Sequence, residues 1–416
     1  MTLIKTSLLN GIAVIIKMLT LLGINKILAV YVGPAGYAAL GQFQNAVQMI
    51  TTFASGAINT GVTKYTAEYY EDEQKQRQVW RTAGTIALIG SIVTSIIIAV
   101  FNQPLAAWFF KNVNYGGVFL WFAATLVFFT FNTLLLAILN GKKAIGRYVM
   151  ANIAGSVFAL VATAIMTIQW GLYGALIALA IYQSISLFVT LLLCYNADWF
   201  KISYLFGKID RQTALNLGKY TAMALTSAAC VPLSQILIRN HLGESFGWNA
   251  AGYWEAMTRL SNAYLMLATT TLGVYYLPKL SELKDSGQIK KEIIQGYKVI
   301  LPVAALAGVV IYLFRDLIIA ILFTKDFSPM RELFAWQMLG DTLKMASWIL
   351  GYLMLGQAMI KLFMMTEIIF SASFVGLTWI LTSWIGFQGV VMAFALNYAL
   401  QLSFMYFSLR LKGTLK

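Results

Sequence analysis

The sequence predicts an all-α integral membrane protein with twelve transmembrane helices, arranged as two six-helix lobes around a central cavity. Of the 416 residues, 59% are hydrophobic and only 11% are charged, whereas a soluble domain carries about 25% charged residues. The apolar residues form long continuous runs, unlike the alternating segments of about 10 residues in a membrane β-barrel. Lys and Arg concentrate in the short polar segments between the runs. A soluble enzyme and a β-barrel are therefore both excluded.

Each expected transmembrane helix is an apolar run of about 20 residues or more, the length that crosses a bilayer. The runs in the first half of the chain are 8–32, 35–63, 82–103, 116–139, 148–170 and 172–195. The first run passes through Lys17 without a small-residue cleavage site, so we do not expect a signal peptide. Pro34 and Pro104 follow the first and third runs, where a helix is expected to end.

The runs in the second half are 216–239, 251–278, 297–323, 331–356, 360–385 and 388–409. Pro278 closes one of them, and Pro232 and Pro302 are candidate hinges. The connections are too short for a soluble domain. The expected division is therefore an N-terminal lobe over 1–208 and a C-terminal lobe over 209–416.

The distribution of Lys and Arg predicts the orientation, because cytoplasmic loops are enriched in these residues. With the N-terminus inside, 21 of the 30 Lys and Arg residues fall in inside-facing segments. The outside-facing segments contain only Lys111, Arg239, Lys325 and Arg331. Both termini are thus expected in the cytoplasm. The net charge of +14 then follows from topology, so no nucleic-acid partner is expected.

An internal repeat supports the two lobes. Ala35-Gly36-Tyr37 opens the second run, and Ala251-Gly252-Tyr253 opens the eighth. Asn45-Ala46 recurs as Asn262-Ala263 at an equivalent depth. Because six is an even number of spans, the two lobes are expected to have the same orientation, with the functional site between them.

Polar side chains recur at helical spacing within several runs. The second run carries a stripe at steps of three and four residues: Asn45, Gln48, Thr52, Ser55 and Asn59. The eighth and tenth runs have similar stripes: Glu255, Arg259, Asn262 and Thr269, and then Gln337, Asp341 and Lys344. Lipid cannot solvate such a stripe, so it should face protein or a water-filled cavity. Hydrogen bonding between packed helices is the simpler alternative.

Charged residues within the runs are the sharper signal. Lys17 lies near the middle of the first run, and the first lobe has no carboxylate within any run. An unpaired buried ammonium is costly, so an anionic ligand or a carboxylate of the second lobe should complete it. Lys26 lies about 180° around the helix from Lys17, unless Gly23 permits a kink. Lys26 could also extend to the membrane interface.

The second lobe carries both signs of charge. Glu255 and Arg259 are spaced as an i,i+4 ion pair, and Asp341 and Lys344 as an i,i+3 pair. Each pair could be structural scaffolding. Glu367 has no oppositely charged neighbour at helical spacing and is a candidate proton or ion site.

Few residues could support catalysis or bind a metal. The chain has one histidine, His241, and two cysteines, Cys194 and Cys230. A zinc or di-iron site needs more ligands of these types. No metal and no cofactor are expected, and the protein is not expected to be an enzyme.

The chain resembles the multidrug/oligosaccharidyl-lipid/polysaccharide exporter (MOP) superfamily, whose fold is MATE-like. Within it, the sequence looks like the Wzx family, the flippases for O-antigen and enterobacterial common antigen. The segments that carry the resemblance are Lys17 and Lys26 around Gly23, Val32–Gly36, Gly61–Tyr65, Tyr276–Ser281, and Arg331–Gln337 with Gly340, Asp341 and Lys344. They extend over essentially the whole chain.

The resemblance implies a flippase of the bacterial inner membrane, acting in polysaccharide and lipopolysaccharide biosynthesis. It would move an undecaprenyl-pyrophosphate-linked oligosaccharide from the cytoplasmic to the periplasmic leaflet by alternating access. Membrane lipids and the glycan polymerase machinery are the further partners that it implies. The expected substrate-binding residues are Lys17, Lys26, Asn45, Gln48, Thr52, Asn59, Lys64, Arg259, Asn262 and Lys344. The expected coupling residues are Glu255, Asp341 and Glu367.

Three other functions remain open from the sequence. A cation-coupled multidrug exporter of the same superfamily would need membrane carboxylates, which the first lobe lacks. A glycan polymerase or glycosyltransferase would need a larger extramembrane loop than the chain has. A scaffold or lipid scramblase would need neither feature.

Overall fold

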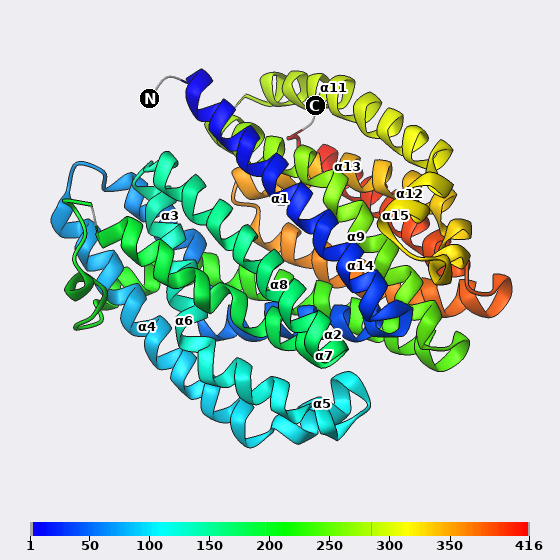
Figure 1. Ribbon diagram of the computed structural model, residues 1–416. Helices are drawn as coiled ribbons and strands as arrows, with labels where there is room; N and C mark the ends of the chain where they lie inside the picture. Colours follow the sequence, from blue (N-terminus) through cyan, green and yellow to red (C-terminus); the bar gives the residue numbers. More distant parts are fainter. Residues whose placement is uncertain (1–2, 196, 284, 415–416) are drawn as a thin grey trace. The chain divides into compact units, whose positions relative to one another are not determined.

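A computed structural model describes residues 3–195, 197–283 and 285–414, and within these ranges the chain is helical without any β-strand (Figure 1). The predicted all-α membrane fold is confirmed. Lys284 and Lys416, two cations of the predicted inside face, lie outside the described residues.

The first half of the chain forms seven α-helices among the described residues: α1 (Leu3–Tyr31), α2 (Gly33–Ala54), α3 (Asn59–Glu68), α4 (Glu73–Val100), α5 (Asn102–Phe110), α6 (Gly116–Gly141) and α7 (Ile145–Tyr195). Helix α7 is two successive helices, because Gly171 adopts φ 55° and ψ −135°. Only glycine takes this conformation without strain. The turn falls between the predicted runs 148–170 and 172–195. Two 3₁₀ turns, η1 (Val113–Tyr115) and η2 (Ile202–Leu205), lie in the connections.

The second half continues with α8 (Arg211–Phe246), α9 (Trp248–Thr271), a π-helical turn η3 (Leu272–Tyr276), α10 (Leu277–Glu282), α11 (Ser286–Leu313), α12 (Arg315–Leu322), a 3₁₀ segment η4 (Lys325–Leu333), α13 (Phe334–Gly356), α14 (Ile360–Ile385) and α15 (Gly389–Leu411). Helix α8 contains Pro232, whose ring removes one backbone hydrogen bond from the helix interior.

Eight helical segments of the described chain are long and apolar enough to span a membrane: Gly11–Tyr31, Glu73–Val100, Val113–Gly141, Ile145–Tyr195, Thr221–Phe246, Ser286–Leu313, Ile360–Ile385 and Gly389–Leu411. Ile145–Tyr195 contains two of the predicted spans. Helices α2, α9 and α13 contain the greater part of the three predicted spans that carry polar stripes. The count of twelve spans stays a prediction.

Several predicted boundaries were wrong. The run 35–63 is interrupted after α2, where Gly56 and Ala57 adopt φ 64° and 53°, and α3 starts a new helix. The run 297–323 is divided at Phe314 between α11 and α12. The run 216–239 continues as helix to Phe246. Apolar composition does not reveal these changes, because they depend on backbone turns and on a helix that continues through polar residues.

The chain forms two compact units. The N-terminal unit comprises Met1–Val32 and Ala39–Pro232, and the C-terminal unit comprises Gly33–Ala38 and Leu233–Lys416. In the N-terminal unit, α6 packs against α3, α4 and α7, and α1 packs against α7. Its apolar core includes Trp80, Leu134, Ile138 and Cys194, each at most 1% exposed. The predicted lobe boundary at 208/209 remains a prediction.

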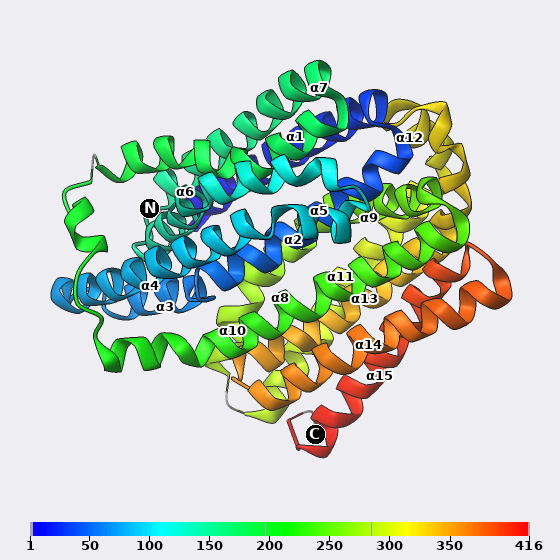
Figure 2. The same cartoon turned by 90° about the horizontal axis from the view of Figure 1, so that it is seen from below.

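In the C-terminal unit, α13 packs against α11 and α15, and α14 lies beside α15 (Figure 2). Its core includes Leu272, Met345, Ile349 and Leu353, none of which is exposed. The repeated tyrosines Tyr37 and Tyr253 both belong to this unit. Their rings contact the ring of Phe327, with centroid distances of 5.1 Å and 6.2 Å. Gly252 permits this packing, since a Cβ there would overlap the carbonyl of Pro34.

Carboxylates begin three of the long helices. Asp72 accepts a hydrogen bond from the Lys75 amide at the start of α4, at 3.0 Å. Asp210 accepts one from the Thr213 amide at the start of α8, at 2.7 Å, and Asp285 caps α11 in the same way. These contacts satisfy amides that have no partner within their own helix.

Candidate functional site

The C-terminal unit buries a trio of charged side chains. Glu255 on α9 accepts a hydrogen bond from Arg239 of α8 through one carboxylate oxygen and from Arg259 through the other, each at 2.7 Å. The Arg239 and Glu255 side chains are 1% and 6% exposed, and that of Arg259 is 16% exposed. Two guanidinium groups and one carboxylate give the trio a formal charge of +1.

Aromatic rings surround the two guanidinium groups. Arg239 lies over the Trp254 ring at 5.5 Å, and Arg259 lies over the Tyr37 ring at 5.6 Å. The face of an aromatic ring attracts a cation, and this attraction is stronger where water is excluded. The rings therefore help to retain two charges that would otherwise be costly to bury.

Arg239 requires a correction. The charge pattern placed it at the end of a span ending at 239, among the outside-facing cations. The structure instead continues α8 for two further turns and buries Arg239 against Glu255. The predicted Glu255–Arg259 pair is present. Glu255 is thus shared by a predicted partner and by one that sequence spacing could not reveal.

A second buried polar cluster lies around Asp341 of α13. This carboxylate is 1% exposed. It accepts hydrogen bonds from the Tyr264 hydroxyl at 2.8 Å and from the Gln337 amide at 3.2 Å. Lys344 makes no ion-pair contact with Asp341, although the structure describes both side chains. Its ammonium instead lies over the Trp348 ring at 4.7 Å and the Phe394 ring at 5.8 Å.

Glu367 lines a small, half-open cavity of the C-terminal unit. The cavity has a volume of ≈ 200 Å³ and is bounded by α13, α14 and α15. Its polar lining comes from Glu367, Thr366, Ser347, Gln401 and Tyr352. These oxygen-bearing side chains around one carboxylate have the chemistry to hold a proton or a small hydrated cation.

The predicted stripe of the second run is only partly present. Asn45 is buried, Gln48 is exposed, and the Thr52 hydroxyl donates to the Gln48 carbonyl of its own helix at 2.7 Å. Asn59 starts α3 and donates to the Thr133 hydroxyl at 3.3 Å. These four side chains therefore do not form one continuous helical face. The break after α2 is the reason.

The predicted lysines of the N-terminal unit occupy different surroundings. Lys17 is exposed and Lys26 is half-buried on α1, which passes through Gly23 without interruption. Lys64 is exposed and forms an ion pair with Glu68 at 3.7 Å. In the C-terminal unit, Asn262 is exposed on α9. No three or more His, Cys, Asp or Glu side chains in the described part of the chain are grouped as a metal site.

This architecture defines a class of protein. Several apolar helices of membrane-spanning length are characteristic of multi-pass membrane proteins, in which buried charges are rare and paired. The fold is similar to that of a multidrug resistance MATE family transporter of the MOP superfamily. With its inward-facing conformation the TM-score is 0.78, at 14% identity, covering 95% of this chain and 94% of that chain. With its outward-facing conformation the TM-score is 0.64, at 15% identity, covering 96% and 95%.

The sequence comparisons are more specific. A family described as "Polysaccharide biosynthesis protein" matches residues 3–284. The lipid III flippases of Escherichia coli (strain K12) and Shigella flexneri are each 30% identical to this chain over 368 residues, covering 88% of either partner. The chain belongs to the polysaccharide biosynthesis protein family. The resemblance to oligosaccharide flippases is thereby confirmed at the level of this family.

Proposed function

We propose that this protein is a flippase for an undecaprenyl-pyrophosphate-linked oligosaccharide in the bacterial inner membrane. It would carry the head group from the cytoplasmic to the periplasmic leaflet by alternating access, with both termini in the cytoplasm. The observation that carries the proposal is the match to lipid III flippases along 88% of this chain and of each relative. No bond of the substrate is made or broken.

The charges of the membrane helices support a pyrophosphate ligand. The Arg239–Glu255–Arg259 trio has an excess of one positive charge, and a guanidinium group can hold two phosphate oxygens at once. Asn45, Gln48, Thr52 and Asn262 supply amide and hydroxyl groups that can bond sugar hydroxyls. We assign these residues, with Lys17, Lys26, Asn59, Lys64 and Lys344, to head-group binding.

Lys17 is well placed to meet an anion. Its side chain is exposed in the middle of α1. The exposed apolar side chains of this part of α1 are Ile12, Ile15 and Leu19, which share one helical face. At 100° per residue, Lys17 lies roughly 165° around the helix from that face. If the apolar face contacts lipid, Lys17 points away from it, as a cation in a wet passage would.

We assign Asp341 and Glu367 to coupling. Both are carboxylates inside the C-terminal unit, and Glu367 lies at a cavity that could admit a proton or a cation. Glu255 would keep the two guanidinium groups in position. The glycan polymerase machinery remains a proposed partner, since it would consume the exported glycan.

The experiment that tests the proposal measures transport of a fluorescent undecaprenyl-pyrophosphate oligosaccharide in proteoliposomes, by its access to a membrane-impermeant glycosidase. Lys17→Ala should slow transport about tenfold or more, because a contact to a charged group is lost. Lys17→Arg should retain most of the rate. Lys111→Ala, the same change at an exposed residue outside the long helices, is the matched control.

The outcomes separate the alternatives. Transport by the wild type that is lost in Lys17→Ala and kept in Lys111→Ala supports the proposal. Equal rates in all variants would remove Lys17 from the site. Drug resistance in cells that overproduce the protein, together with an absence of oligosaccharide transport, would favour a cation-coupled multidrug exporter instead.

A further inference from the structure

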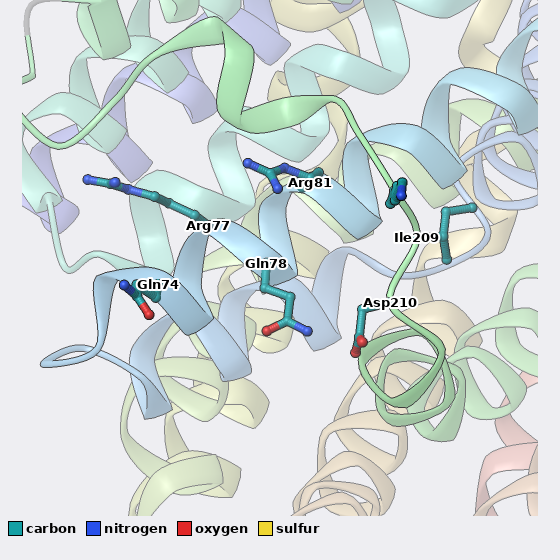
Figure 3. A pocket seen from close by; sticks show the side chains of 7 residues that line it. Gln74, Arg77, Gln78, Arg81, Ile209 and Asp210 are labelled. Carbon is teal, nitrogen blue, oxygen red and sulfur yellow. The ribbon is translucent and has the colours of Figure 1, made fainter.

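A second basic site lies in the N-terminal unit. It is a pocket of ≈ 610 Å³ between α4 and the linker Lys201–Asp210 that leads into α8. Its lining residues are Gln74, Arg77, Gln78, Arg81, Lys208, Ile209 and Asp210. Figure 3 shows Arg77, Gln78 and Arg81 on α4 beside the linker segment that carries Ile209 and Asp210.

The pocket is held in shape by contacts between the linker and α4. Gly84 lies so close to Leu205 that a Cβ would overlap the Leu205 carbonyl. The Thr85 hydroxyl lies 3.0 Å from the Gly207 carbonyl and accepts from the Gly207 amide at 3.2 Å. The Asp210 amide donates to the Thr82 hydroxyl at 3.2 Å. The linker is therefore fixed on the helix next to the cations that it faces.

The charged side chains of the pocket differ in their contacts. Asp210 is occupied by the amide of Thr213, and Arg77 is paired with Glu73 at 2.6 Å and stacked on the Tyr204 ring at 4.3 Å. In the described part of the chain, no ion pair holds Arg81 or Lys208. Three cations against one carboxylate give the lining a formal charge of +2. Phosphate is the anion that such a group of Arg, Lys and Gln donors fits.

The linker also exposes apolar side chains next to its lysines. Ile202, Phe206 and Ile209 are 45%, 39% and 45% exposed, and they alternate with Lys201 and Lys208. On α4, the exposed apolar stretch begins at Ile89, about 12 Å along the helix from Arg81. Cations beside exposed apolar groups at the end of a span are the pattern of a segment lying in an anionic membrane interface.

We propose that this pocket binds the phosphate of an anionic phospholipid of the surrounding leaflet. Arg81 and Lys208 contact the phosphate oxygens, Gln74 and Gln78 donate to the glycerol part, and Ile202, Phe206 and Ile209 contact the acyl chains. The site is separate from the residues assigned to transport, so its test does not depend on the transport activity.

The experiment measures lipid retained by the purified full-length protein in native mass spectrometry, after addition of phosphatidylglycerol or phosphatidylcholine. Wild type should retain phosphatidylglycerol preferentially. The double variant Arg81→Gln/Lys208→Gln should retain about tenfold less phosphatidylglycerol than wild type. Arg410→Gln/Lys412→Gln removes one exposed arginine and one exposed lysine elsewhere and should behave as wild type.

Further variants separate charge from geometry and from misfolding. Thr85→Val keeps every charge but releases the linker, and it should reduce retention. Lys208→Gln alone changes an exposed side chain, so it tests the site even if the double variant fails to fold. Equal losses in both double variants would overturn the proposal, because general electrostatics would then explain binding. If Thr85→Val retained as much phosphatidylglycerol as wild type, the proposal that the linker held on α4 forms the lipid-binding pocket would be overturned.

A competition experiment with inorganic phosphate distinguishes a lipid phosphate from a free phosphate ion as the ligand. Inorganic phosphate in excess should leave the retained phosphatidylglycerol in place, since it lacks acyl chains. Displacement of the lipid by inorganic phosphate would show that the pocket takes a free anion, and the lipid proposal would fail.

Discussion

Glu255 is satisfied by two guanidinium groups, and this arrangement explains how three charges persist inside the C-terminal unit. Each carboxylate oxygen has one short charged contact, at 2.7 Å. Desolvating an ion costs several kcal/mol, and close pairing offsets that cost only when the geometry is good. Removing the carboxylate would leave two like charges facing each other in a site with little water.

We therefore expect Glu255→Gln to lower the free energy of unfolding by about 3–5 kcal/mol, the range for breaking a buried ion pair. Thermal unfolding in detergent measures the change. Glu73→Gln is the matched control, because its pair with Arg77 is exposed and exposed pairs contribute about 0–1 kcal/mol. Similar melting temperatures for the two variants would show that the buried trio is not a stabilising unit.

The residue scale also shows what sequence can predict about the site. The Glu255–Arg259 contact follows from its i,i+4 spacing on one helix. Arg239 and Tyr264 were missed, because they reach Glu255 and Asp341 from other helices, 16 and 77 residues away. Helical periodicity contains no information about which helices are neighbours. The polar stripes predicted which helix faces avoid lipid, but not which helices those faces contact.

At the scale of elements, α8 begins at a carboxylate that titrates. The Thr213 amide, which donates to the Asp210 carboxylate, holds the pKa of that carboxyl below its ordinary value, and the Gln78 side chain acts in the same direction. A carboxyl whose pKa is lowered by folding contributes stability above its unfolded pKa. That contribution is lost as the pH falls through the folded pKa.

The expected result is a pH-dependent effect of Asp210→Asn. The variant should melt below wild type at neutral pH, and the difference should shrink as the pH is lowered through about 4 and below. Melting curves at a series of pH values measure it. Asp198→Asn makes the same change at an exposed carboxylate in the same connection and is the control. A difference that grows on acidification would contradict the assignment.

The sequence predicted elements best where apolar composition alone determines them. Runs such as 116–139 and 360–385 correspond to the long helices α6 and α14. It failed at 35–63, where Gly56 and Ala57 turn the backbone within an otherwise helical pattern, and at the end of α8, where polar residues continue the helix. A hydropathy pattern does not distinguish a polar residue in a loop from a polar residue that continues a helix.

For the whole molecule, the orientation rests on the distribution of positive charge. The segments assigned to the cytoplasm carry 21 of the 30 Lys and Arg residues. Asp72, Asp210 and Asp285, which cap α4, α8 and α11, fall on this same predicted side. The helices that begin there therefore share one direction through the membrane in the predicted topology.

This topology predicts opposite labelling of two single-cysteine variants. In a Cys194→Ala/Cys230→Ala background, Lys325→Cys should react with a membrane-impermeant maleimide in intact cells. Lys412→Cys should react only after the membrane is permeabilised. Both side chains are exposed, so access across the membrane is the variable measured. Labelling of both positions in intact cells, or the reverse pattern, would refute the predicted orientation.

The hydrogen bond from Arg239 to Glu255 joins α8 to α9 roughly two turns from the tight connection at Gly247. The short connection holds the two helices together at one end, and the ion pair holds them together further along. The helical hairpin should consequently move as a rigid unit, since separating α8 from α9 would leave buried charges without their ion-pair partners. Bending of α8 is then expected at Pro232, which lies before Arg239 in the helix and therefore outside the part that the ion pair and the connection hold.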